Sequence, residues 1–324
     1  MKRKLMSLLG GAAGAVVLSA CAGGGTNMTE AMDQVPAPEE PYVAFTDMEW
    51  FRELSEEDLE ARERDYRWST ADLAVGFDDL GPYLMQGRLD GLPLDLYALD
   101  QALRVGFSAE ASGALIGDLD ADALHAELTE RGWEGEDVLR VTDDVELSHL
   151  VVFFPQVVID DKALVYARHG VDLEEGSSAA EDERFAPYLD CLGEVVAGQI
   201  IQGVAVGVAP DDEDLPRGVI CAAGDPESLS AEIVEEIESG RNPYTDREYG
   251  DDLIEPEADP HSELARVYVS FPERGEHDQL LTSVLFMMHQ QGNLPGLIHQ
   301  ADQEFQEWLE DTLSTPPGGG EDEE

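Results

Sequence analysis

The seven histidines are the first candidates for metal binding or acid–base chemistry, because imidazole both binds metals and titrates near neutral pH. They are spread along the chain at His125, His149, His169, His261, His277, His289 and His299. No His-Glu-x-x-His motif is present, and a Gly-Asn-Leu-Pro break lies between the last two histidines. Isolated histidines are typical of structural or surface positions. The sequence therefore predicts no metal site and no cofactor.

The nucleophile motifs of common hydrolases and redox proteins are also missing. The nearest match to Gly-x-Ser-x-Gly, at 106–110, lacks the second glycine that the tight nucleophile turn needs. Lys162 is the only lysine after residue 4, so no Ser-x-x-Lys motif follows. There is no Cys-x-x-Cys either, which excludes thioredoxin-like and c-type haem chemistry. We identify no catalytic residue.

The triplet Asp118-x-Asp120-x-Asp122 imitates the start of a calcium-binding loop. Position six of that loop is Ala123 where glycine is required, and position twelve is Thr129 where a glutamate binds the ion. A helix N-terminus whose acids offset the helix dipole explains the triplet better. Acid pairs suited to glycoside hydrolysis stay open among the 71 acidic residues, but none can be selected.

The start of the chain has the layout of an export signal. Basic residues at 2–4 precede an apolar run at 5–17, an arrangement that keeps the positive charge in the cytoplasm. A spanning helix needs about 20 apolar residues, and this run is shorter and interrupted by glycine. An uncleaved membrane anchor is a weaker alternative.

The next four residues, Leu18-Ser19-Ala20-Cys21, resemble the lipobox of bacterial lipoproteins. The resemblance implies that Cys21 accepts a diacylglyceryl group and becomes the mature N-terminus, with two or three acyl chains such as palmitate. Two or more chains give stable anchoring, whereas one holds a protein only marginally. An ordinary secretory signal with an incidental cysteine is the alternative.

Two cysteines remain in the body of the chain. A protein that folds outside the cytoplasm can keep disulfides, so we predict a bond between Cys191 and Cys221. The bond would close a loop of about 30 residues and contribute roughly 3 to 4 kcal/mol in the chain-entropy model. Two buried free thiols are the alternative.

The charge of the chain limits its partners. It carries 71 acidic against 19 basic residues, a net charge of −52. Nearly complete loss of lysine, with acids along the whole length, is similar to the composition of proteins from halophiles, where salt screens the repulsion between carboxylates. The same sign excludes nucleic acid, whose phosphates need clustered Lys and Arg, and direct docking on anionic lipid. An acidic surface for a cationic partner is the alternative.

The body of the chain has the pattern of an α+β fold. A hairpin at 103–119 precedes a helix at 120–132, and a similar order of hairpin at 203–225 and helix at 226–240 follows. We therefore expect two tandem hairpin-plus-helix units that form antiparallel or mixed sheets packed with helices. Further expected helices are at 46–70, 185–201 and 280–289; further expected strands are at 138–141, 151–154, 156–159, 163–166 and 266–271; a long loop is expected at 241–263.

These patterns predict five segments. They are a signal peptide at 1–20, a disordered tether at 21–45, a first unit at 46–202, a second unit at 203–312 and a disordered acidic tail at 313–324. The order of hairpin, acid-capped helix ending in Gly132-Trp133 and further hairpin is faintly similar to actinobacterial lipoproteins of unknown function. That resemblance supports the fold class and implies no chemistry.

The sequence thus favours an exported, lipid-anchored protein on the extracytoplasmic face of the cell membrane. We expect a non-enzymatic role, in which it binds an envelope protein or a small ligand of unknown identity or assists assembly. A solute-binding lipoprotein of a transporter is one alternative, since the size and the two expected units fit. An extracytoplasmic hydrolase is the other.

Overall fold

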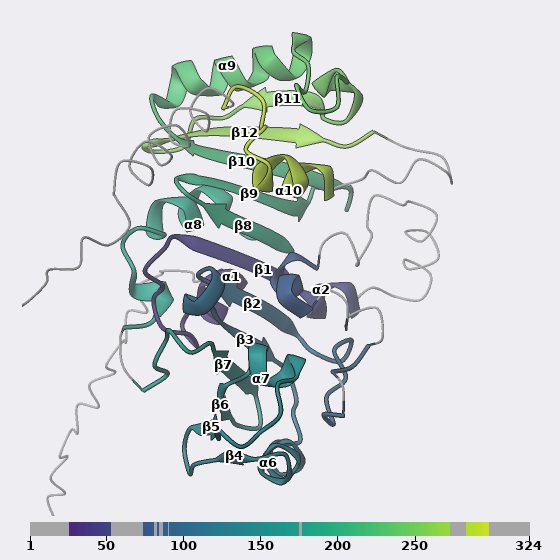
Figure 1. Cartoon of the computed structure of the whole chain (residues 1–324). Helices are drawn as coiled ribbons and strands as arrows, with labels where there is room; N and C mark the ends of the chain where they lie inside the picture. The colour runs from purple at the N-terminus through teal and green to yellow at the C-terminus, as the bar shows by residue number, and fades with distance from the viewer. Residues whose placement is uncertain are drawn as a thin grey trace, which may run out of the picture.

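The computed structural model describes residues 26–52, 74–80, 83, 87–89, 91–174, 177–272 and 283–297. Its described strands form one twelve-stranded sheet in which every pair of neighbours is antiparallel, as Figure 1 shows from β11 at the top to β4 at the bottom. The order is β11-β12-β10-β9-β8-β1-β2-β3-β7-β6-β5-β4. The strands are β1 (Tyr42–Asp47), β2 (Gln101–Val105), β3 (Ser112–Ile116), β4 (Trp133–Glu134), β5 (Leu139–Val141), β6 (Gln156–Ile159), β7 (Ala163–Ala167), β8 (Ala197–Ile201), β9 (Val204–Pro210), β10 (Pro216–Ala223), β11 (Ile254–Ala258) and β12 (Leu264–Ser270).

The predicted fold class, α+β with two tandem hairpin-plus-helix units, is wrong, because the described strands of both expected units belong to one antiparallel sheet. β1 pairs with β8 from Tyr42↔Ile201 to Thr46↔Ala197 and joins both parts of the chain into one antiparallel sheet. The boundary expected at 202/203 falls in the turn between β8 and β9, which are themselves paired. Strand order nevertheless recurs on the two sides of the join, as β2-β3-β7-β6 and as β9-β10-β12-β11.

Helices lie on both faces of the sheet. The described helices are α1 (Asn27–Met32), α2 (Met48–Arg52), η1 (Val75–Leu80), η2 (Ser108–Glu110), α6 (Ala121–Glu130), α7 (His149–Phe153), η3 (Ala179–Glu181), α8 (Ala186–Leu192), α9 (Pro226–Ser239), η4 (Tyr249–Asp251) and α10 (Ser283–Gln290). Successive strand residues point to opposite faces, and β10 shows this directly. Val219 and Cys221 belong to the core cluster that includes residues of α1, η3 and α8, whereas Ile220 and Ala222 belong to the cluster that includes residues of α6, α9 and α10.

Several local predictions are confirmed. The hairpins β2–β3, β6–β7 and β9–β10 and the helices α6 and α9 lie where the pattern places them. Asp120 caps α6 by accepting from the Ala123 N–H at 3.0 Å, and Asp225 caps α9 by accepting from the Ser228 N–H at 2.9 Å. An acid at this position satisfies an N–H that the first helical turn leaves unpaired.

Other local predictions are wrong. The strand expected at 151–154 is instead the end of the helix α7 and its C-cap residue, because Ser148 caps the helix start and Leu150 is buried in the core. The helix expected at 185–201 ends at Leu192, and β8 follows. The loop expected at 241–263 contains η4 and the edge strand β11. Residues 53–70 of the expected helix at 46–70 lie outside the described residues, and its first residues belong to β1 and α2.

The tether predicted at 21–45 is also wrong over the described part of that range. Met28, Ala31 and Met32 of α1 are at most 1% exposed in the core, and β1 starts at Tyr42. Methionines among glycines, prolines and acids made this stretch look too polar to fold alone. It folds because it packs on a sheet built from the rest of the chain. The signal peptide at 1–20 and the tail at 313–324 lie outside the described residues.

Candidate functional site

The disulfide between Cys191 and Cys221 is present, as predicted. It joins α8 to β10 with a Cα–Cα distance of 6.3 Å, and both cysteines are fully buried. The α8 end of the bond is held further by Arg266, whose guanidinium donates to the Cys191 carbonyl oxygen at 3.3 Å. The bond therefore fixes a helix to the sheet. Cys21, the predicted site of lipid attachment, lies outside the described residues.

The acids that imitate a calcium loop have other partners. The Asp118 carboxylate pairs with the Lys162 ammonium, which lowers the pKa of the aspartate and raises that of the lysine. Asp120 caps α6 through its side chain. Within the described ranges no group of three or more histidine, cysteine or acidic side chains could hold a metal ion. The interpretation of this triplet as a helix start is the one that the geometry supports.

The described histidines do not come together. The His149 ring is bonded to the Tyr83 hydroxyl, and the His261 ring lies 2.8 Å from the Asp190 carboxylate. His125 lies on α6, 3.4 Å from the hydroxyl of Thr129. His277 and His299 lie outside the described residues.

Among the described histidines, His289 alone is buried in the core. It lies on α10 above the centre of the sheet, and its Nδ1 donates to the side-chain oxygen of Gln199 on β8 at 3.1 Å. The Gln199 amide in turn lies 3.4 Å from the Tyr42 hydroxyl on β1. Burial lowers the pKa of His289 to about 3, against smaller opposing effects of backbone groups at Val204 and Ile201. The ring is therefore neutral, and it connects α10 to the join between β1 and β8.

A shallow hollow lies between β5, β6 and the segment that follows β7. Its volume is about 340 Å³, and it is lined by Arg140, Val141, Pro155, Gln156, His169, Gly170, Val171 and Asp172. Donors and acceptors therefore meet there on a surface open to solvent. We take this hollow as the candidate binding site.

Two side chains organise the hollow. Arg140 of β5 lies 2.6 Å from the Glu174 carboxylate and 3.3 Å from that of Asp172, and the bond to Glu174 contributes most to raising its pKa. Gln156 of β6 donates from its amide to the Val171 carbonyl oxygen at 2.7 Å. These bonds hold the loop after β7 against the sheet. The charge of Arg140 is balanced by two carboxylates, so the hollow suits a polar ligand better than a strongly anionic one.

Sequence reasoning missed this hollow. Arg140 and Gln156 were part of expected strands, and His169 was treated as an isolated histidine. The lining comes from three segments that only the sheet brings together, so no motif marks it. The sole available signal was the polar residues at the ends of neighbouring expected strands.

None of the helices in the described ranges has the length and hydropathy that crossing a bilayer requires. Comparison with protein-family models, with curated proteins and with solved structures gives no match for this chain.

Proposed function

We propose that the chain is an exported, lipid-anchored protein of the cell envelope that binds a partner or ligand without catalysing a reaction. The observation that carries the proposal is the motif Leu18-Ser19-Ala20-Cys21 behind a short cationic and apolar start. The disulfide between Cys191 and Cys221 supports it, because such bonds persist outside the cytoplasm. The membrane contact is then the acyl chains on Cys21, on the extracytoplasmic face.

Labelling of growing cells with an alkyne analogue of palmitate tests the anchor. The wild-type protein should carry the label and fractionate with membranes, and Cys21→Ala should lose both properties. Cys191→Ala with Cys221→Ala is the control, since it also removes cysteine residues, here those of the disulfide, and should keep the label. Label retained in Cys21→Ala would remove the anchoring proposal.

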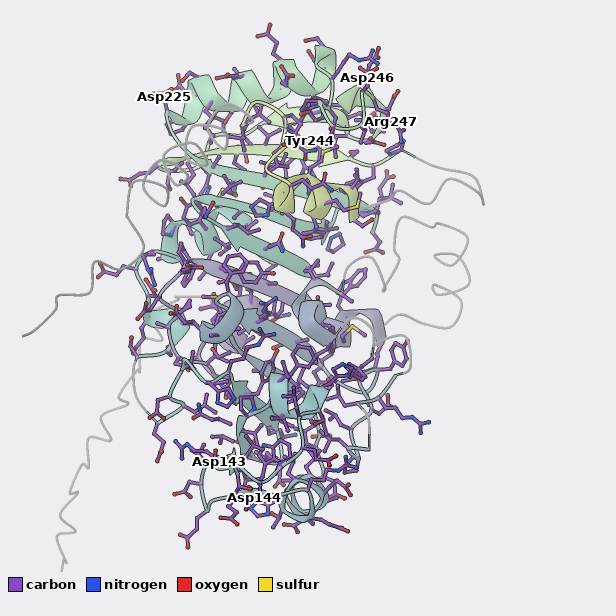
Figure 2. All side chains as sticks on the ribbon, in the orientation of Figure 1. Asp143, Asp144, Asp225, Tyr244, Asp246 and Arg247 are labelled. Atoms are coloured by element: carbon purple, nitrogen blue, oxygen red, sulfur yellow. A yellow bond between two sulfur atoms is a disulfide. The ribbon has the colours of Figure 1, made fainter. Side chains whose placement is uncertain are left out.

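The acidic surface suits a partner or medium that tolerates carboxylates. Figure 2 shows labelled acids beside both outer strands of the sheet, with Asp143 and Asp144 beside β4 and Asp246 near β11. Charge spread over the whole molecule supports adaptation to salt rather than one docking patch for a cationic protein. Nucleic acid is a poor partner because the chain is strongly negative, as are the phosphates.

The hollow beside Arg140 favours a small polar molecule as the ligand. The transporter alternative depended on two lobes around a deep cleft, and one continuous sheet supports it less well. The hydrolase alternative lacks support, because the carboxylates around Arg140 are engaged with its guanidinium and no other convergent acid pair lies in the hollow.

Native mass spectrometry of the protein released from its own membranes tests the binding role. A ligand should appear as an adduct of constant mass that is lost in Gln156→Leu, which removes an amide that lines the hollow. Gln202→Leu, in the β8–β9 turn, is the matched control. An adduct that survives Gln156→Leu would place the ligand elsewhere.

A further inference from the structure

The first core residue follows Cys21 closely in the chain. Only the four residues at 22–25 separate Cys21 from Thr26, whose hydroxyl caps α1 by accepting from the Thr29 N–H at 3.2 Å. Five backbone steps span at most about 18 Å even when fully extended. If Cys21 is acylated, the folded body is held next to the bilayer and cannot move freely above it.

The position of α1 decides which part of the body is held there. The Asn27 side-chain amide donates to the Asp47 carboxylate at 2.6 Å, so α1 begins at the end of the sheet where β1 finishes. The turn at 160–162 lies at the same end of the strands. This follows from the pairings Asp47↔Gln101, Gln101↔Ile116 and Ile116↔Ala163, because β7 starts directly after that turn. On the other side of the β1–β8 pair, Thr46 pairs with Ala197 and Ala197 pairs with Val208. The turn at 211–215 between β9 and β10 therefore lies at this end as well. We call this end of the strands, with these two turns, the entry edge; the term does not refer to the outer strands β11 and β4.

The segment after α1 is fixed as firmly as the helix. The Ala179 N–H donates to the Val35 carbonyl oxygen at 2.8 Å, and the Arg184 guanidinium donates to the carbonyl oxygen of Glu39 at 2.7 Å. With Met28 and Met32 buried as well, α1 cannot unpeel without exposing core. The chain available to span the distance to the lipid is therefore limited to residues 22–25.

The opposite end of the sheet lies farther from the start of α1 than the link to Cys21 can reach. The turn at 202–203 lies there, because the Gln202 N–H donates to the Pro41 carbonyl oxygen, just before β1 starts. From Asp47 back to Pro41 the strand covers six steps, or about 20 Å, which already exceeds the reach of the link. We infer that the lipid bilayer faces the entry edge of the sheet and that the turn at 202–203 points away from it. This inference rests on the proposed acylation of Cys21.

The chain itself supplies the probe for a test. Lys162, the only lysine after residue 4, lies in a turn of the entry edge, and its side chain is 75% exposed. An amine-reactive dye on the N-terminally acetylated mature chain will therefore label this position. Cys21 is the one thiol left free by the disulfide, so it can be coupled to a maleimide lipid in zwitterionic vesicles. At about 1 M NaCl the Debye length of about 3 Å removes repulsion by the acids.

A nitroxide on the lipid head groups should quench the dye on Lys162 strongly. In the matched control, Lys162→Arg with Gln202→Lys moves the single lysine to the opposite end, and quenching should be weak. Insertion of twenty Gly and Ser residues after Gly25 should abolish the difference. Equal quenching at positions 162 and 202 with the native link would overturn the inference. Because the lipid is attached chemically, that result would leave the acylation of Cys21 in cells to its own labelling experiment.

Discussion

The two halves of the sheet share a framework and differ in what is inserted into it. In both, two paired strands lead through a helix capped by aspartate to two more strands, in the orders β2-β3-β7-β6 and β9-β10-β12-β11. Between helix and strands the first half inserts β4, β5 and α7, and the second inserts the loop that contains η4. The framework forms the core, whereas the insertions give each half its own surface.

Each insertion is secured by one buried aromatic side chain. The Trp133 indole N–H donates to the Phe154 carbonyl oxygen at 2.8 Å, and the Tyr249 hydroxyl donates to the Asn293 carbonyl oxygen at 2.9 Å. The hollow beside Arg140 occurs in the first half and the disulfide in the second. The first half therefore contains the candidate site, whereas the second contains a covalent cross-link between a helix and the sheet.

The largest effect should come from the join that both halves share. Phe45 of β1 is fully buried beside α1, and Phe45→Ala should cost about 3 to 5 kcal/mol, the usual range for a buried aromatic residue. Urea unfolding gives the loss, and native-state hydrogen exchange should show weaker protection in both halves. Glu49→Ala, at an exposed site on α2, is the control. Loss of protection in one half alone would mean that the halves unfold independently.

Removal of the disulfide should act on one half. Cys191→Ser with Cys221→Ser opens a loop with a sequence separation of 30 residues, which costs about 3 to 4 kcal/mol in the chain-entropy model. Exchange should accelerate first in β9, β10 and α8. The same acceleration in β2 and β3 would contradict a local role.

Acid should weaken the join through His289. Its pKa falls from 6.5 to about 3 on folding. Below pH 6.5 the unfolded state therefore binds a proton that the folded state does not bind, and the free energy of unfolding decreases as the pH is lowered. Between pH 7 and pH 5 the loss should be about 2 kcal/mol. The paired carboxylates titrate at lower pH, because the pKa values of Asp182 and Asp225 are lowered. Urea midpoints that fall equally in His289→Gln would contradict this assignment.

Salt should stabilise both halves alike. Acids occupy the turns at 160–162 and 211–215, one in each half, and about 2 M NaCl screens their repulsion. The urea midpoint should rise from dilute buffer to that concentration. A midpoint that does not change would count against adaptation to high salt.

The smallest effects should come from the two helix caps. Asp120→Ala and Asp225→Ala each remove one carboxylate that accepts from a backbone N–H, so each should lower the thermal midpoint slightly. Asp225→Asn, which keeps an acceptor, should restore most of the loss. A larger loss for Asp225 than for Asp120 would fit its extra bond from the Ser228 hydroxyl.

Local features of this fold were predictable and distant ones were not. The hairpin β6–β7 is encoded by two apolar, strand-favouring runs around 160–162, and the caps of α6 and α9 by single aspartates. The pairing of β1 with β8 joins residues more than 150 positions apart, so no local pattern reveals it. α7 was missed because its valines and phenylalanines favour strands, and burial of Leu150 outweighs that preference.

The candidate sites divide in the same way. The disulfide followed from two cysteines and an inferred compartment, and the structure confirms it. The hollow depends on the sheet that brings Arg140, Gln156 and His169 together, which spacing along the chain does not show.

Mass spectrometry of the N-terminal peptide from the membrane-bound protein tests the central claim most directly. The account predicts a peptide that begins at Cys21 and carries a diacylglyceryl group, with or without a third acyl chain. A mature protein that begins at another residue, or at Cys21 with an unmodified thiol, would contradict it.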